Sequence, residues 1–322
     1  MSIATKRAEE ILLGHERKVK KDNYSGGGGK KRYSKPKSGS GLKNIASAAA
    51  KKPEVMVKIT SGSKGGQSVQ NHLDYIGRNG NVSLETNDGQ TLIGKAQAKT
   101  IKDRWANQDM IDTKGQHRQT LNLVLSMPAK TAPDKIQAAA REFAKHVFSD
   151  HEYVMALHTD TDHPHVHLSV TMQNREGERM NPRKNDLFEW RVLFAEKMRE
   201  QGVDCAATKR IHRGKFQKGK NSTVENIVKR GGHSYVAKAR REQLVEAIKN
   251  NQRPLHPFLK EQLAAKSIMA KELTTLSRDL YQQNMKTEAR QISMLAKEIN
   301  NSTPTTQLQS AFDKTIEKDI ER

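Results

Sequence analysis

Cysteine is almost absent from this sequence, since Cys205 is the only one among 322 residues. A single thiol excludes an internal disulfide framework and any zinc or iron–sulfur site built from several cysteines. A bound metal would therefore need histidines and carboxylates. Long apolar runs are also missing: no stretch approaches the roughly 18 consecutive apolar residues of a membrane span, and the apolar run near the N-terminus is too short for a secretory signal. We expect a cytoplasmic protein without a membrane span.

Acidic residues are scarce beside basic ones, with 36 Asp and Glu against 57 Lys and Arg and a formal net charge of +21. This excess predicts an anionic polymer or surface as the partner. Apolar residues (34%) and aromatic residues (5%) are also few, below the usual share for a globular chain. Only part of the chain can then build a core, and we expect one compact domain with basic, extended flanks.

The first 52 residues are basic and contain four consecutive glycines at 26–29. Such a composition cannot bury enough apolar area to offset the entropy of ordering it. We predict a disordered basic arm over residues 1–52, with a short helix near residues 6–13. The arm either keeps the chain soluble or attracts nucleic acid, and the sign of its charge favours the second role.

Residues 53–208 have the patterns of a folded domain. Their elements alternate in an order that predicts an α+β fold, in which a largely antiparallel sheet is covered by helices. Residues 79–115 lack a clear pattern, apart from Trp105, which we expect to pack a short helix. The predicted strands cover residues 54–60, 120–128, 152–159 and 165–172, and the predicted helices cover 67–76, 133–148 and 188–200.

The last third of the chain changes character again. Residues 209–222 read as a basic linker, and residues 223–322 as a helical C-terminal extension. Helices are expected within residues 237–250 and 257–300, separated by prolines. No heptad pattern is sustained, so a coiled coil is only weakly indicated. The extension is either a solvated appendage or a docking region.

Four of the 12 histidines lie within LHTDTDHPHVHLSV, residues 157–170. His165 and His167 alternate along a predicted strand, so both imidazoles project from one face. The preceding strand ends near His158, and antiparallel pairing through the TDTDHP turn brings it opposite that pair. Three imidazoles can then hold one cation and leave positions open for water or substrate, as a Lewis-acid site requires.

Simpler readings of this cluster exist. A lone buried histidine is usually an ordinary core residue, but three at this spacing across a hairpin favour metal binding. Asp160, in the turn, either caps backbone groups or orients one of the histidines. If it orients a histidine, Asp160 belongs with the catalytic residues. His163, in the same turn, is a candidate substrate contact.

A nucleophile must be sought among the hydroxyls and water. Tyr75, in NHLDYIGRNG, lies near the end of the predicted helix 67–76, off its apolar stripe and close to Arg78. A partly exposed phenol beside a cation loses its proton more readily when a phosphate and a metal arrive. The residues alone leave two alternatives for Tyr75, a catalytic nucleophile or an ordinary packing side chain.

The tyrosine in HLDYIGRNG together with the downstream HTDTDHPHVH resembles the relaxases, the HUH nucleases that initiate plasmid mobilisation and conjugation, and among them the P-type group. The similarity covers about residues 54–208. In rolling-circle replication initiators, which share the chemistry, the tyrosine follows the histidine pair. The order of the motifs here therefore favours a relaxase.

This resemblance implies a site- and strand-specific DNA nickase. Tyr75 would attack a phosphate of single-stranded DNA at a plasmid origin of transfer and form a 5′-phosphotyrosine, while His158, His165 and His167 hold a divalent cation. The family generally works with Mg²⁺ or Mn²⁺, whereas three imidazoles favour Mn²⁺ or Zn²⁺. The identity of the metal is therefore open.

DNA binding by such a protein should be largely electrostatic. We expect phosphate contacts from Arg78 and from the basic cluster Lys209, Arg210 and Arg213. The resemblance also implies accessory nicking proteins and a type IV secretion coupling protein as partners, and translocation from a bacterial cytoplasm with the DNA into a recipient cell.

Some features differ from the family. Relatives often carry Asn four residues after the last motif histidine, where this chain has Thr171. The serine-containing DNA-contact motif is not evident, and Ser83 is its nearest candidate. Two other functions fit the same residues: a hydrolytic metal-dependent nuclease or rolling-circle replication initiator, and a non-enzymatic basic DNA-binding protein.

Overall fold

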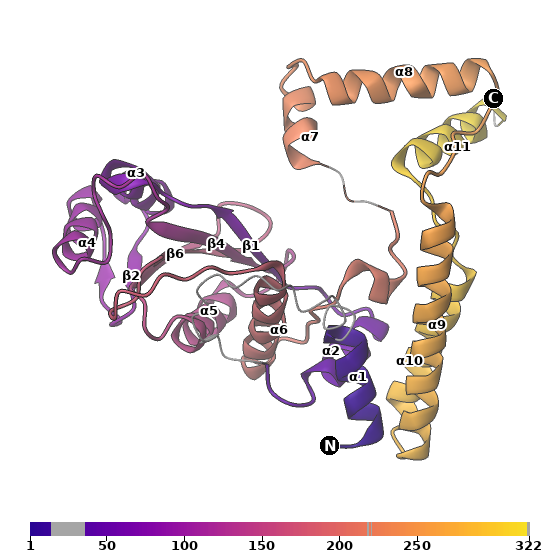
Figure 1. Ribbon diagram of the computed structural model, residues 1–322, viewed down its shortest axis with the longest axis horizontal. Helices are drawn as coiled ribbons and strands as arrows, with labels where there is room; N and C mark the ends of the chain where they lie inside the picture. Colours follow the sequence, from indigo (N-terminus) through magenta and orange to yellow (C-terminus); the bar gives the residue numbers. More distant parts are fainter. Residues whose placement is uncertain (14–35, 218, 220, 321–322) are drawn as a thin grey trace, which may run out of the picture. The chain divides into compact units, whose positions relative to one another are not determined.

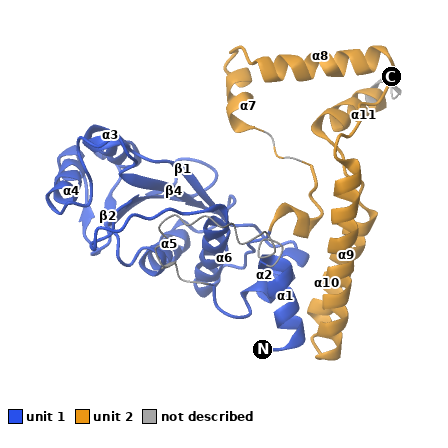
Figure 2. Cartoon of the chain, in the orientation of Figure 1, with its two compact units in different colours: residues 1–208 blue, residues 209–322 orange. Residues whose placement is uncertain are grey.

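The computed structural model describes residues 1–13, 36–217, 219 and 221–320 (Figure 1). The chain forms two compact units, residues 1–208 and 209–322 (Figure 2). Within the described residues, no helix is both long and apolar enough to cross a membrane.

Unit 1 is built on a six-stranded sheet with the strand order β1-β4-β6-β5-β2-β3. Every neighbouring pair of these strands is antiparallel, so the predicted α+β fold with a largely antiparallel sheet is confirmed. The strands are β1 (Met56–Ser61), β2 (Leu84–Thr86), β3 (Thr91–Leu92), β4 (Thr120–Ser126), β5 (Tyr153–His158) and β6 (His165–Thr171).

The two faces of the sheet carry different side chains, because residues along a strand alternate between them. Val166, Leu168 and Val170 of β6 are buried on one face, where α5 (Pro133–Val147) and α6 (Lys184–Glu200) pack (Figure 1). His165 and His167 project from the other face. That face is partly covered by α3 (Gly65–Ile76) and α4 (Lys95–Asn107).

A small apolar core attaches α3 and α4 to the histidine face. It joins buried residues of both helices to Val154 and Ala156 of β5. Ala156 is paired with His167 in the sheet, so this core ends directly beside the histidines. Trp105, which the sequence placed in a short helix, is fully buried in α4.

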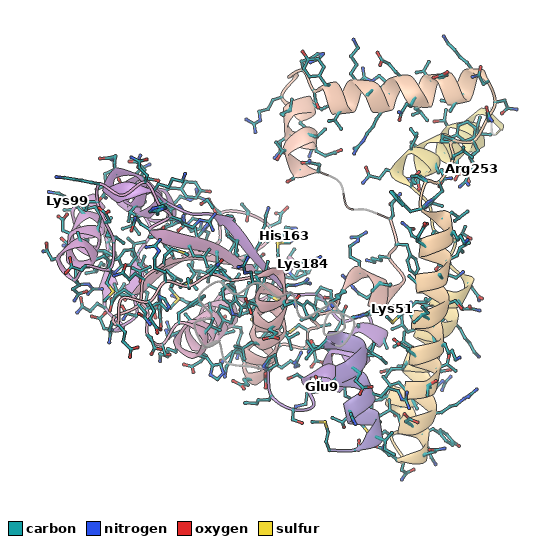
Figure 3. The ribbon with its side chains drawn as sticks, in the orientation of Figure 1. Glu9, Lys51, Lys99, His163, Lys184 and Arg253 are labelled. Carbon is teal, nitrogen blue, oxygen red and sulfur yellow. The ribbon has the colours of Figure 1, made fainter. Side chains whose placement is uncertain are left out.

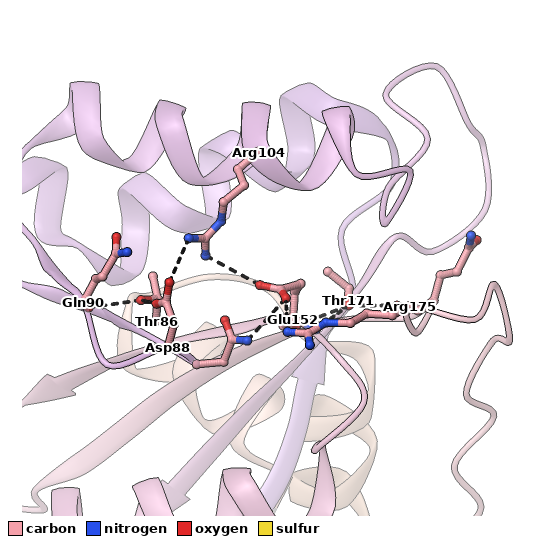
Figure 4. Close-up of polar contacts among 9 residues, drawn as sticks. Thr86, Asp88, Gln90, Arg104, Glu152, Thr171 and Arg175 are labelled. Atoms are coloured by element: carbon pink, nitrogen blue, oxygen red, sulfur yellow. Dashed lines mark hydrogen bonds and ion pairs between the residues drawn. The ribbon is translucent and has the colours of Figure 1, made fainter.

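Glu152 anchors the start of β5. Its side chain is only 7% exposed and accepts a 2.7 Å hydrogen bond from Nη2 of Arg175. It also forms a 3.6 Å ion pair with Arg104 of α4, and Arg104 reaches Asp88 in the β2–β3 turn (Figure 4). These ion pairs connect α4, the β2–β3 hairpin and the central strands.

The N-terminal region differs from the disordered arm predicted for residues 1–52. Ile3–Leu13 (α1) and Ser40–Ala49 (α2) are helices, and α1 includes the short helix expected at 6–13. Ala8, Leu12 and Ile45 are buried, because the two helices pack on each other and α2 also contacts α6. This burial stabilises the two helices, which the composition of residues 1–52 alone does not predict. Residues 14–35, which include the four consecutive glycines, lie outside the described residues.

Unit 2 is helical, as predicted. The extension contains α7 (Ser222–Lys229), α8 (Tyr235–Lys249), α9 (Leu259–Gln282), α10 (Lys286–Asn301) and α11 (Gln307–Ile320). The helices α9 and α10 form an antiparallel hairpin with a core that includes Leu276 and Ile292. The basic linker contains a 3-10 turn, η3 (Arg210–Arg213).

Candidate active site

Three histidines meet at one end of the β5–β6 hairpin. His158 and His165 are direct cross-strand partners, and His167 follows His165 on the same face. The ring centroids of His158 and His167 are 4.5 Å apart, and one nitrogen from each of the three rings lies within 4.8 Å of the others. The predicted hairpin is thus present and gathers the three imidazoles.

Backbone carbonyls fix the orientation of two of these rings. Nε2–H of His158 donates to the carbonyl oxygen of Ile76 at 2.7 Å, and Nδ1–H of His165 donates to the carbonyl oxygen of His163 at 2.9 Å. Because a carbonyl can only accept, each bond places the proton on that nitrogen and leaves a lone pair on the other. This is the arrangement that a metal-binding histidine normally has.

Two buried nitrogens of the cluster lack a hydrogen-bond partner. Nδ1 of His158 and Nδ1 of His167 are buried and unpaired among the described residues. Burial lowers the pKa of His167 to about 3, and the neighbouring His158 and His165 contribute to that lowering; burial also lowers the pKa of His158. Neutral imidazoles with unused lone pairs fit a divalent cation, which would satisfy these atoms.

Tyr75 lies beside this cluster, in the last turn of α3. Its ring centroid is 5.6 Å from that of His167, with the rings nearly perpendicular. The side chain is 52% exposed, so the phenol is open to a large substrate. The helix is held there by the His158–Ile76 hydrogen bond, since Ile76 is the residue after Tyr75.

Arg78 and Asp160 complete the site. The guanidinium carbon of Arg78 lies 5.6 Å from the ring centroid of Tyr75, and its Nη2 donates to Oδ2 of Asp160 at 2.6 Å. Asp160, which the sequence suggested as an orienter of a histidine, therefore hydrogen-bonds Arg78. Backbone carbonyls orient two of the rings instead.

His163 and the basic residues at 209–213 are the remaining predicted site residues. The side chain of His163 is exposed on the hairpin turn (Figure 3). Lys209, Arg210 and Arg213 lie at the start of unit 2, where Nη2 of Arg210 donates to the carbonyl oxygen of Gln217 at 2.7 Å. Their predicted contacts with DNA stay a proposal.

Sequence reasoning missed His72, one helical turn before Tyr75. Its ring centroid is 6.1 Å from that of Tyr75, and burial lowers its pKa to about 4. The i, i+3 spacing in HLDY was the available signal. Because His72 lies far in sequence from the other histidines, their spacing alone does not point to it.

Part of the chain, including this site, matches a known protein family. Residues 75–203 match the family described as "Relaxase: MobA/VirD2-like, nuclease domain", a segment that contains Tyr75, Arg78, Asp160 and all three clustered histidines. This segment of the chain is thus similar to a relaxase nuclease domain. The family match thus includes the histidine hairpin and every strand of the sheet except β1.

Among curated proteins, the chain is similar to three named "T-DNA border endonuclease VirD2". It is 27% identical to that of Rhizobium rhizogenes over 188 residues, covering 51% of this chain and 43% of the relative. The proteins of Agrobacterium fabrum and Rhizobium radiobacter are also 27% identical, each match covering 50% of this chain and 41% and 43% of the relative. The chain thus spans about two fifths of the length of these relatives.

Proposed function

We propose that this protein is a DNA relaxase that cuts one strand at a specific site by transesterification through Tyr75. The observation that carries the proposal is the position of the exposed Tyr75 ring, 5.6 Å from His167 in the three-histidine cluster. The family match supports it, as do the relatives named endonucleases.

The reaction follows from the groups on the chain. The Oη of Tyr75 loses its proton and bonds to the phosphorus of one phosphodiester, and the bond from phosphorus to the 3′ oxygen breaks. The 3′ oxygen takes up a proton and leaves as a hydroxyl, while the DNA stays attached as a 5′-phosphotyrosine. Because the phosphodiester bond energy is kept, the 3′-hydroxyl can rejoin the strand without ATP.

His158, His165 and His167 would hold a divalent cation, Mg²⁺ or Mn²⁺ or, from the ligand set, Zn²⁺. When bound, such a cation polarises the phosphate and neutralises the charge that develops on its oxygens. Arg78 offers a planar, permanently charged donor for the same phosphate, and Asp160 holds that donor beside Tyr75. Asp160 is therefore proposed to contribute to catalysis through Arg78.

The substrate is proposed to be single-stranded DNA at the origin of transfer of a plasmid, and the role to be initiation of mobilisation or conjugation. The net charge of +21 supports binding to a polyanion. Lys209, Arg210 and Arg213 are proposed to add phosphate contacts. Lys218 and Lys220, two further basic residues of this linker, lie outside the described residues.

Partners and transport follow from the same proposal. An accessory nicking protein and a type IV secretion coupling protein would dock on the helices of unit 2, and the protein would travel with the attached strand from a bacterial cytoplasm into a recipient cell. Unit 2 lies outside the family match.

The deciding experiment is to find the covalent bond. The protein is incubated with Mn²⁺ and single-stranded DNA from the origin region of its genetic element, or with a randomised single-stranded library, and peptides that retain nucleotide are identified by mass spectrometry. We expect one adduct, on Tyr75. Tyr75→Phe should abolish it, whereas Tyr281→Phe, at a tyrosine 64% exposed in unit 2, should leave it unchanged.

The other outcomes point to the two remaining functions. Cleavage without an adduct, or cleavage that survives Tyr75→Phe, would indicate a hydrolytic nuclease in which water attacks. DNA binding without cleavage would indicate a non-enzymatic DNA-binding protein whose histidines stabilise the fold.

A further inference from the structure

A basic groove lies between α3 and α4, away from the histidines. Its cavity has a volume of about 520 Å³, and no acidic side chain is among the residues that line it. The lining residues are Gly66, Gln67, Gln70, Lys95, Lys99 and Lys102, together with Ala96 and Thr113.

Three lysines form the α4 side of this groove. Lys95, Lys99 and Lys102 are spaced at i, i+4 and i+7, which puts them on one face of the helix. Lys102 forms an ion pair with Asp103 at 2.5 Å, but neither Lys95 nor Lys99 has an ion pair among the described residues. Both are exposed (Figure 3 labels Lys99), so two ammonium groups remain available to an anion.

Two glycines form the start of α3 at this groove. Gly65 has a φ of +67°, and a Cβ on Gly66 would lie 3.1 Å from Cβ of Thr113. The glycines thus let the helix begin tightly against the Thr113 loop. Neither α3 nor α4 has an acidic residue in its first turn, so the positive end of each helix dipole adds to the potential of the lysines, which Asp103 offsets only in part.

The groove and Tyr75 lie on two flanks of the same helix. Gln70 and Tyr75 are five residues apart, about 140° around the axis and about 7.5 Å along it. One flank of α3 faces the lysines and the other faces His167. The solvent side between them carries the exposed amides of Gln67 and Asn71, which are hydrogen-bonded to each other at 2.8 Å, and Asp74, whose Oδ1 accepts from Nε2 of Gln70 at 3.0 Å.

We propose that the groove between α3 and α4 is a phosphate-binding subsite for the single DNA strand whose neighbouring phosphate reaches Tyr75. The strand crosses the solvent side of α3 over Gln67 and Asn71, and its next phosphates lie against Lys95 and Lys99. This inference rests on the proposed function. The crossing is one helix width, about 10–12 Å, which a few nucleotides span.

The groove also explains how one strand would be held without base recognition. Lysines act as point charges on phosphates and carry no sequence information. The subsite therefore adds affinity and fixes the direction in which the strand leaves Tyr75. Choice of the nick site must come from other contacts.

The test measures binding of a fluorescent 20-nucleotide oligothymidylate by anisotropy between about 50 and 200 mM NaCl, in a Tyr75→Phe background that prevents cleavage. We expect Lys95→Gln/Lys99→Gln to weaken binding roughly tenfold. The slope of log affinity against log salt should become shallower by about 1.4, since each phosphate neutralised on single-stranded DNA accounts for about 0.7. The matched control is Lys135→Gln/Lys145→Gln on α5, at the opposite face of the sheet, which makes the same change in net charge.

An equal loss in the control variant would overturn the subsite, because it would indicate a general effect of charge. An unchanged affinity in the groove variant, or a loss confined to duplex DNA, would also overturn it. Adduct formation by the protein with Tyr75 intact is measured separately, so the groove can fail while the proposed function stands. Protein that neither binds the oligonucleotide nor forms an adduct contradicts both.

Discussion

Arg78 and Asp160 are hydrogen-bonded over 82 residues of sequence, with Nη2 2.6 Å from Oδ2. The pair joins the end of α3 to the histidine hairpin. Arg78 has a φ of +49°, a left-handed conformation that turns the chain sharply after Tyr75. Its guanidinium consequently lies near the tyrosine ring and the hairpin turn together.

Arg78→Lys should therefore slow adduct formation about ten- to a hundredfold, since an ammonium cannot reproduce the planar fork between carboxylate, ring and phosphate. Stability should change by less than about 1 kcal/mol, because the side chains of the pair are 34% and 55% exposed. Asp160→Asn should give a smaller loss of rate. The rate of adduct formation and the thermal denaturation of the same samples are measured. A variant that forms the adduct slowly only because it is partly unfolded would contradict the prediction.

The three-histidine cluster predicts measurable metal binding by the folded protein. After chelation, adding Mn²⁺ at a hundred times its Kd should raise the free energy of unfolding by about 2.7 kcal/mol. His165→Ala should abolish most of this gain, and His117→Ala, at an exposed histidine of unit 1, should leave it intact. Affinity should be weaker for Mg²⁺ than for Mn²⁺ and tighter for Zn²⁺. Titration calorimetry that detects none of the three would contradict the site.

The histidine hairpin could be predicted because its evidence is local. Alternation in HVH fixes one face, and a short turn between two apolar strands fixes the pairing with His158. The helix that carries Tyr75 is similarly visible from the spacing of Val69, Leu73 and Ile76, which are all buried.

Other parts of the site depend on contacts distant in sequence. The Ile76 carbonyl that orients His158 and the Arg78–Asp160 pair each connect residues 82 positions apart. The strands β2 and β3 contain three and two residues, too few for a periodic pattern. The helix α1 is ordered by packing against α2, which local composition cannot reveal.

Glu152 should be among the most costly unit 1 residues to truncate. Glu152→Ala would leave Arg175 and Arg104 without the buried carboxylate that they share, at a cost of about 1–3 kcal/mol. Asp88→Asn, at a carboxylate 44% exposed in the same set of contacts, should cost less than about 1 kcal/mol. Chemical denaturation followed by circular dichroism measures both, and similar costs for the two variants would argue against an anchoring role for Glu152.

Cys205 should resist thiol reagents in the folded protein. Its side chain is fully buried, Sγ–H donates to the Ala195 carbonyl oxygen at 3.4 Å, and burial raises its pKa to about 11. At pH 8 only about one thiol in a thousand would be ionised. Iodoacetamide should label the protein rapidly in denaturant and negligibly without it. Rapid labelling under native conditions would mean that the region around α6 opens readily.

Ending the chain at Thr208 tests the division into two units and the role of the second. Thr208 must be kept, because its backbone N–H donates to Oε2 of Glu54 at 2.9 Å. We expect the shortened protein to unfold at the temperature of unit 1 in the full chain and to form the Tyr75 adduct. For this shortened protein, the slope of log affinity for DNA against log salt should be shallower by about 0.7 for each phosphate that Lys209, Arg210 and Arg213 neutralise in the full chain.

A chain ending at Asn221 restores these residues without the five helices, so it separates DNA binding from docking. Both shortened chains should fail to transfer DNA between cells, and undiminished transfer would show that the helices of unit 2 are a solvated appendage.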